Sequence, residues 1–145
     1  MESNFRPQHI SYSALSLYEK CPRCYYLQYV IGLKPEPKES WKFGTAYHLG
    51  LAYYYSGRKF IDGFKASLRD QFVLGGTAIK FTKMAEMMFS HYLTFGDQYE
   101  AELIEYPFKC QLINPLTDEE LPIPIKGVID LFTEDGAVID NKTSG

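Results

Sequence analysis

The chain has 145 residues, of which 46% are hydrophobic and 23% charged, and its formal net charge is -3. This length and apolar content suit one globular domain with its own core, and they exclude a disordered or low-complexity protein. No apolar run approaches the length of a membrane span, and the N-terminus lacks a signal-peptide pattern. Three cysteines, an odd number, fit a reducing compartment. We therefore expect a cytoplasmic protein without a membrane partner.

The charge is distributed unevenly along the chain. Residues 1–90 hold 12 Lys and Arg against 7 Asp and Glu, a balance of +5, whereas residues 91–145 hold 3 against 11, a balance of -8. The first part could follow a phosphate backbone while the second holds a metal ion. The alternative is that both surfaces are merely solvated.

The first part of the chain reads as a series of helices. Ser11 or Ser13 can cap the first helix, and Pro22 can open the second, which Gly32 ends. Two prolines mark a loop over 34–40, and a glycine pair at 75–76 separates the last two helices. The expected helices are 11–20, 22–30, 41–55, 59–72 and 79–95. The alternative end of the last helix is residue 99.

The second part reads as strands near 103–112, 121–131 and 137–142, with turn residues at Asn114-Pro115 and Asp118. We expect one domain over residues 1–145, of α/β class and α+β-like. Its mainly helical part (1–99) packs on a small, mainly antiparallel or mixed sheet (100–145).

Carboxylates and a lysine gather on the last expected hairpin. Side chains alternate across a strand, so Asp140 and Lys142 share one face. Asp130 joins them if a three-residue loop, 134–136, connects the strands, because this register sets Asp130 opposite Asp140. A two-residue turn at 135–136 would split the two acids across the sheet. We predict the three-residue loop, or a bulge with the same effect.

Opposed carboxylates need a cation between them. Directly opposed residues have Cβ atoms about 4.5–5.5 Å apart, and two anionic groups at that separation repel each other. Oxygen ligands with room for water and phosphate favour Mg²⁺ or Mn²⁺. Lys142 can then hold or deprotonate the attacking water. The alternative is an ordinary solvent-facing hairpin, although acids within apolar strand runs usually have a partner.

A histidine lies far upstream on the helix expected over 41–55. His48 has Gly44 and Ala52 four residues to either side, so this helix face can approach its neighbour closely. Taken alone, such a histidine is more often a packing residue than a ligand. Together with the acidic hairpin, it becomes a candidate metal ligand.

Four segments resemble successive motifs of the PD-(D/E)XK nucleases, specifically the RecB-like branch. This branch includes the AddB and RecB nuclease domains, CRISPR-associated RecB-like exonucleases and many phage exonucleases. The segments are ISYSALSLYEKCPRCYYLQYVIGL (10–33), GTAYHLG (44–50), GVID (127–130) and DNKTS (140–144). The resemblance covers nearly the whole chain and implies a restriction-endonuclease-like core.

The resemblance also implies roles for individual residues. His48, Asp130 and Asp140 match metal ligands, Lys142 matches the lysine of the (D/E)XK pair, and Glu105 lies where the branch often has an acid. Branch members use Mg²⁺ or Mn²⁺ to cut DNA, commonly as exonucleases on single strands or ends. The implied setting is DNA repair, recombination, or phage or CRISPR DNA processing in a bacterial, archaeal or phage-infected cell.

Two departures from the branch bear on activity. The branch has a further helix and further strands after the lysine, whereas this chain stops at Gly145. We therefore expect a fragment, or a sheet completed by a partner or by self-association. Cys21 matches the first of four iron–sulfur ligands in some members, but with Cys24 and Cys110 alone the chain cannot supply that cluster. The alternative for these cysteines is reduced thiols packed between helices.

Two other functional classes remain open beside the nuclease. One is a noncatalytic DNA-binding or assembly module that keeps the nuclease scaffold. The other is a structural interaction domain, which would neither bind nor cut DNA.

Overall fold

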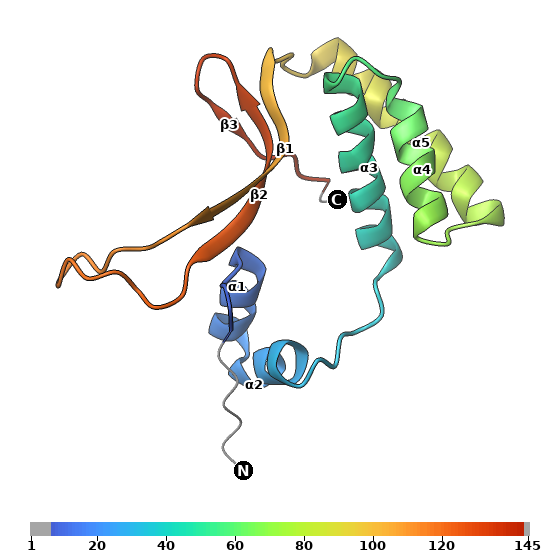
Figure 1. The fold of residues 1–145 in the computed structure, drawn as a ribbon. Helices are drawn as coiled ribbons and strands as arrows, with labels where there is room; N and C mark the ends of the chain where they lie inside the picture. Colours follow the sequence, from blue (N-terminus) through green and yellow to red (C-terminus); the bar gives the residue numbers. More distant parts are fainter. Residues whose placement is uncertain (1–6, 144–145) are drawn as a thin grey trace. The chain divides into compact units, whose positions relative to one another are not determined.

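The computed structural model describes residues 7–143 and contains helices followed by strands (Figure 1). Ser144, the last residue of the fourth motif, lies outside this range. The strands form an antiparallel sheet in the order β1-β2-β3. This arrangement confirms the expected class, a mixed α/β fold with helices first and sheet second. The elements are α1 (Tyr12–Lys20), α2 (Pro22–Tyr25), the π-helix η1 (Tyr26–Val30), α3 (Glu39–Tyr55), α4 (Phe60–Asp70), α5 (Gly75–Phe95), β1 (Ala101–Cys110), β2 (Ile125–Thr133) and β3 (Val138–Ile139).

The chain divides into two compact units. The first comprises residues up to Glu36 together with Pro107–Val128, and the second comprises Pro37–Tyr106 together with the chain from Ile129 onward. β1 and β2 each contribute residues to both units. All candidate metal ligands, and the candidate catalytic lysine, belong to the second unit.

The first unit contains the N-terminal helices. The Ser11 hydroxyl accepts a hydrogen bond from the backbone N–H of Ala14 at 3.2 Å, which confirms the predicted cap of α1. The helix expected over 22–30 begins at Pro22 as predicted, but its second half is the π-helix η1. Gly32, with φ of +84°, follows that segment in a conformation that glycine adopts without strain.

The cysteines of this unit differ from the expectation. Cys21 and Cys24 form a disulfide with their Cα atoms 5.2 Å apart, and Cys24 is exposed. The alternative of reduced thiols packed between helices is therefore wrong. Two residues separate the cysteines, and the first turn of α2 brings them within the Cα spacing that a disulfide requires. Cys110 is exposed and not disulfide-bonded.

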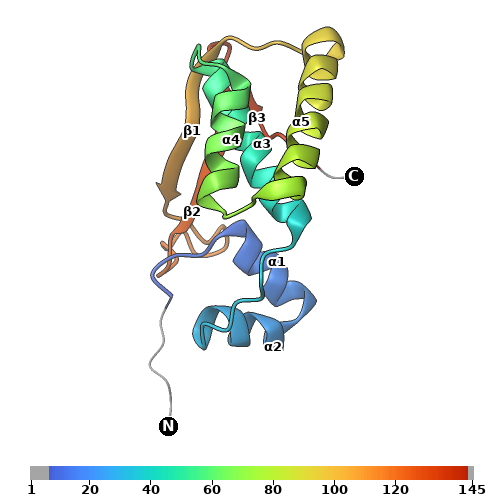
Figure 2. The same cartoon turned by 90° about the vertical axis from the view of Figure 1, so that its right-hand side faces the viewer.

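The second unit is built on a helical core in which α3, α4 and α5 lie side by side (Figure 2). Phe64 of α4 is fully buried among the aromatic rings of Phe43 and Phe60. Gly50 permits the close approach of α3 to α4, since a Cβ there would lie 2.6 Å from the ring of Phe60. The core residues are Phe43, Ala46, Tyr47, Leu51, Phe60, Phe64, Leu68, Val73, Phe81 and Ala85.

Two helix starts differ from the prediction. α3 begins at Glu39, inside the segment expected to be a loop, with an acidic side chain in its first turn where the helix dipole favours one. α5 begins at Gly75 rather than at 79, so the glycine pair opens this helix instead of lying between helices. Gly75 has φ of +62°, and glycine accommodates that conformation at a helix start.

The hairpin between β2 and β3 has the predicted register. Leu131 pairs with Ile139 and Phe132 with Val138, and the backbone N–H of Thr133 donates to the carbonyl of Ala137 at 3.0 Å. The connecting loop is therefore the three-residue segment 134–136, in which Gly136 has φ of +87°. Continued by one residue, this register sets Asp130 opposite Asp140, and it excludes the two-residue turn.

β1 has the expected length but begins at Ala101 rather than at 103, whereas β2 and β3 are shorter than expected. β2 begins at Ile125 rather than at 121, because Pro122 and Pro124 lack the N–H that a strand ladder needs. β3 ends at Ile139, since the backbone N–H of Asn141 donates to the side chain of Asp130 at 2.9 Å rather than continuing the ladder. Among the helices of residues 7–143, none has the length and apolar character needed to cross a bilayer.

Candidate metal centre

Three side chains from three elements converge in the second unit. His48 comes from α3, Glu105 from β1 and Asp130 from β2, and one ligand atom of each lies within 4.8 Å of the other two. One imidazole and two carboxylates form a donor set that suits a divalent cation with hard oxygen ligands. The structure thus brings together His48 and Asp130, two of the main predicted ligands, and Glu105, the additional predicted acid.

Asp130 is the centre of this group. Its Oδ2 lies 3.3 Å from Nδ1 of His48 and accepts the hydrogen bond from the backbone N–H of Asn141. The side chains of His48 and Asp130 are only 27% and 17% exposed. Contacts from a helix and from the hairpin therefore fix the direction of this carboxylate before any cation arrives.

Glu105 reaches the group through an unusual backbone conformation. Its φ is +48°, the left-handed region that L-residues seldom occupy. Such a conformation costs about 1–3 kcal/mol and is concentrated at functional sites. Partial desolvation and the nearby charge of Asp130 raise the pKa of the Glu105 carboxyl, while His48 opposes that shift. A bound cation would favour the ionised form of both acids.

The remaining two predicted residues form a separate pair beside the group. Nζ of Lys142 donates to Oδ1 of Asp140 at 2.6 Å, and both side chains are mostly exposed. The Asp140 carboxylate is therefore not part of the three-residue group, although the hairpin register sets Asp140 opposite Asp130. An exposed ion pair of this kind contributes about 0–1 kcal/mol, so its partners can separate readily.

An open pocket adjoins the group. Its volume is about 560 Å³, and it is lined by Gly44, Thr45, His48, Leu49, Ser67 and Glu105. His48 and Glu105 thus face a space that can admit water and a phosphate group. Neither Ser67 nor the backbone N–H of Asn141 was predicted, because a serine within a helix and a main-chain group carry no sequence motif.

The last segment of the hairpin packs against α3 at a glycine. A Cβ at Gly44 would lie 2.9 Å from Oγ1 of Thr143, which is closer than such contacts normally come. Gly44 is one helical turn before His48. The small residue that the sequence placed beside His48 therefore lets the chain after Lys142 approach the same helix.

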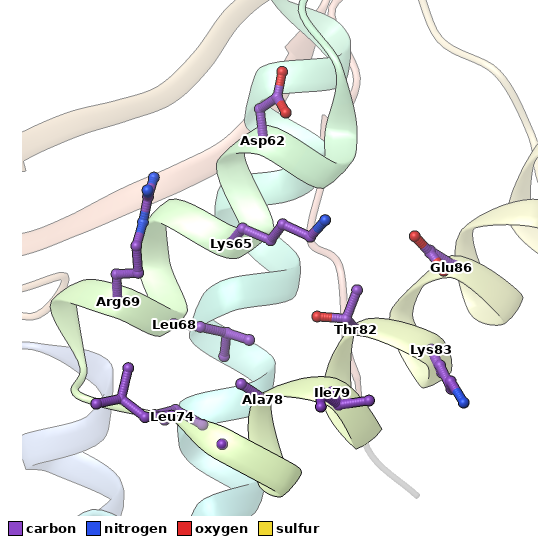
Figure 3. A pocket seen from close by; sticks show the side chains of 12 residues that line it. Asp62, Lys65, Leu68, Arg69, Leu74, Ala78, Ile79, Thr82, Lys83 and Glu86 are labelled. Atoms are coloured by element: carbon purple, nitrogen blue, oxygen red, sulfur yellow. The ribbon is translucent and has the colours of Figure 1, made fainter.

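A larger hollow lies between α4 and α5 (Figure 3). Its volume is about 750 Å³. Its rims carry side chains of both signs, Asp62, Lys65 and Arg69 from α4 and Lys83 and Glu86 from α5 (Figure 3). These charges are spread around an apolar floor and do not converge on one point, so this hollow holds no group of ligands like the one around Asp130.

The residues do not fit an iron–sulfur cluster. Cys21 is bonded to Cys24, and Cys110 is the one other cysteine of the chain. A cluster needs four ligands, usually thiolates. The cysteines of this chain fall short of that number, and no chemical step is assigned to them.

Comparison with protein families gives one match. The model of the PD-(D/E)XK nuclease superfamily matches residues 9–145, which is nearly the whole chain. No curated protein and no solved structure matches significantly.

Proposed function

Because the chain belongs to the PD-(D/E)XK nuclease superfamily, we propose that it is a divalent-metal-dependent nuclease that hydrolyses phosphodiester bonds of DNA. The observation that supports this proposal most is the convergence of His48, Glu105 and Asp130 within 4.8 Å. Membership implies a nucleic-acid substrate. The finer parts of the proposal are three. The chain cuts DNA from single strands or ends, and it belongs to the RecB-like branch. It acts in the cytoplasm, in repair, recombination, or phage or CRISPR DNA processing.

The proposed roles follow from the geometry of the site. His48, Glu105 and Asp130 would hold Mg²⁺ or Mn²⁺, and the Asp140 carboxylate would be a further ligand in place of its pair with Lys142. A bound metal ion of this kind lowers the pKa of its water ligand and neutralises phosphate charge. Lys142 would orient the attacking water as an ammonium group, or would accept the proton of that water after first losing its own proton to solvent. The backbone N–H of Asn141 keeps the Asp130 carboxylate in place during these events.

Incubation of the chain with labelled DNA tests the proposal. Single-stranded and double-stranded DNA are each incubated with Mg²⁺, Mn²⁺ or EDTA. We expect shortened products with either metal and none with EDTA, because the acids need a cation to act on phosphate. Binding without products in any metal would instead favour the noncatalytic module. The absence of both binding and products would favour the structural interaction domain.

The contact between Gly44 and Thr143 gives a further prediction. Gly44→Ala should lower the cleavage rate about 10- to 100-fold, because a displacement near 1 Å at the chemistry can have that effect. The added methyl group would press on Oγ1 of Thr143, the residue directly after Lys142. The rate is measured in single turnover with Mn²⁺, beside the thermal midpoint.

The matched control for this prediction is Gly76→Ala. Gly76 also lies in a helix, but an added Cβ there meets no atom within 4 Å. Gly76→Ala should therefore cleave at the wild-type rate. Equal rates for the wild type and Gly44→Ala would show that the Thr143 contact does not position the catalytic segment.

A further inference from the structure

The first turns of α3 carry an exposed aromatic surface that the proposed metal centre does not use. Trp41 is the single tryptophan of the chain, and 54% of its surface is exposed. Nζ of Lys38 lies 5.9 Å from the centroid of the Trp41 ring. Tryptophan is usually well buried, so an exposed one beside a lysine suggests an external ligand.

This surface lies on the same face of α3 as the metal centre. Trp41 precedes His48 by seven residues, which places the two about 20° apart around the helix and about 10.5 Å apart along it. The core side of the helix is a different face, occupied by Phe43, Tyr47 and Leu51. Trp41 and His48 therefore point away from the helical core in nearly the same direction.

Between Trp41 and His48, α3 presents only the small residues Gly44 and Thr45 on this face, and both also line the pocket beside His48 and Glu105. Oγ1 of Thr143 lies against Gly44. A ligand that enters the pocket can therefore follow α3 past Thr45 toward the indole ring. This continuity joins the exposed aromatic surface to the proposed reaction site.

The local charge selects an anionic ligand with a flat apolar part. The ammonium group of Lys38 lies over one face of the indole ring, and Lys42 follows Trp41 in the same turn. Single-stranded nucleic acid offers both features, since its phosphates meet basic groups while its bases stack on aromatic rings. A duplex keeps the faces of its internal bases stacked on one another, so only the outer faces of its end pairs are open to the indole.

We propose that Trp41 is the stacking platform for an unpaired base of single-stranded DNA held in the metal centre, with Lys38 contacting a neighbouring phosphate. This inference rests on the proposed function and names its substrate as a single-stranded end. Trp41 lies about two helical turns from His48, so the stacked base belongs to a nucleotide near the one that is cut.

The intrinsic fluorescence of the protein tests the proposal without catalysis. Because Trp41 is the single tryptophan, its emission reports stacking directly. The full chain is titrated in EDTA with a dye-labelled oligothymidylate, and binding is followed in parallel by the anisotropy of the dye. We expect quenching of the tryptophan emission that saturates with the anisotropy signal. A blunt duplex of equal length should quench much less.

Variants complete the test. Trp41→Ala should weaken single-strand binding about 5- to 100-fold, the range expected for losing one base stack, with an unchanged thermal midpoint. Phe95→Ala is the control, because Phe95 is another exposed aromatic residue of the same unit, 74% exposed on α5.

Lys38→Ala should reduce the slope of log affinity against log salt by about 0.7, the value for one phosphate contact on a single strand.

The outcomes separate the two proposals. Saturating anisotropy with unchanged tryptophan emission, or equal affinities for Trp41→Ala and the wild type, would overturn the stacking role while leaving the nuclease proposal intact. No anisotropy change with either DNA would also overturn the stacking role, and the cleavage assay with Mg²⁺ or Mn²⁺ decides the nuclease proposal separately. Equal quenching by the blunt duplex would contradict the preference for single strands.

Discussion

Asp130→Asn should abolish metal-dependent cleavage while the chain remains folded. Asparagine keeps the shape of aspartate, and its side-chain oxygen can still accept the hydrogen bond from the Asn141 N–H. The substitution removes the negative charge that a divalent cation requires beside His48 and Glu105. We expect a loss of about 10²- to 10⁴-fold in rate, which corresponds to several kcal/mol of lost charge stabilisation in the transition state.

Single-turnover rates at saturating Mn²⁺, with circular dichroism to monitor the fold, measure this effect. The control is Glu134→Gln, because Glu134 is an exposed acid in the hairpin loop and is not part of the three-residue group. That variant should cleave normally. Cleavage by Asp130→Asn at the wild-type rate would show that the chemistry, if any, occurs elsewhere in the chain.

Lys142→Met should also eliminate most cleavage, but by a different route. Methionine resembles lysine in length and lacks the ammonium group, so water is no longer oriented or deprotonated. Loss of a general acid–base group typically costs about 10²- to 10⁴-fold in rate. The metal affinity should change little, because a lysine ammonium group only donates hydrogen bonds and has no lone pair to offer a cation.

A loss of folding stability should not account for the reduced cleavage by Lys142→Met. The pair with Asp140 is exposed on both sides, so its loss removes about 0–1 kcal/mol. Lys126→Met, at an exposed position of β2, is the matched control. Mn²⁺ affinity and cleavage rate are measured on the same preparations. A parallel loss of metal affinity and cleavage in Lys142→Met would assign the lysine a structural role instead.

The hairpin register could be predicted from the sequence because two independent constraints agree. Side-chain alternation requires an odd-length loop if the acids are to share a face, and Gly136 is able to take the positive φ that such a loop requires. The register puts Asp130 opposite Asp140 and thereby fixes the backbone of the site. It does not fix where each side chain points.

The Asp140 carboxylate shows that limit. Alternation places it on the face of Asp130, yet its Oδ1 accepts the hydrogen bond from Lys142. Whether the Asp140 carboxylate turns toward Lys142 or toward Asp130 depends on its rotamer. At an exposed position the rotamers differ little in free energy. Residue order alone does not determine that outcome.

The sequence motifs identify Glu105 only as an acid near the start of the sheet. Its approach to Asp130 depends on the left-handed backbone at its own position, a conformation that glutamate does not favour and that no local pattern signals. Pro107 follows two residues later and is not a residue expected inside a strand.

The most direct test of the metal centre is the position of a bound Mn²⁺ ion in crystals, located by its anomalous scattering. The proposed function predicts a peak about 2.0–2.2 Å from ligand atoms of His48, Glu105 and Asp130, the range for small divalent ions with oxygen and nitrogen ligands. The peak should disappear in crystals of Asp130→Asn. A folded protein whose Mn²⁺ peak lies away from all three side chains would contradict the assignment.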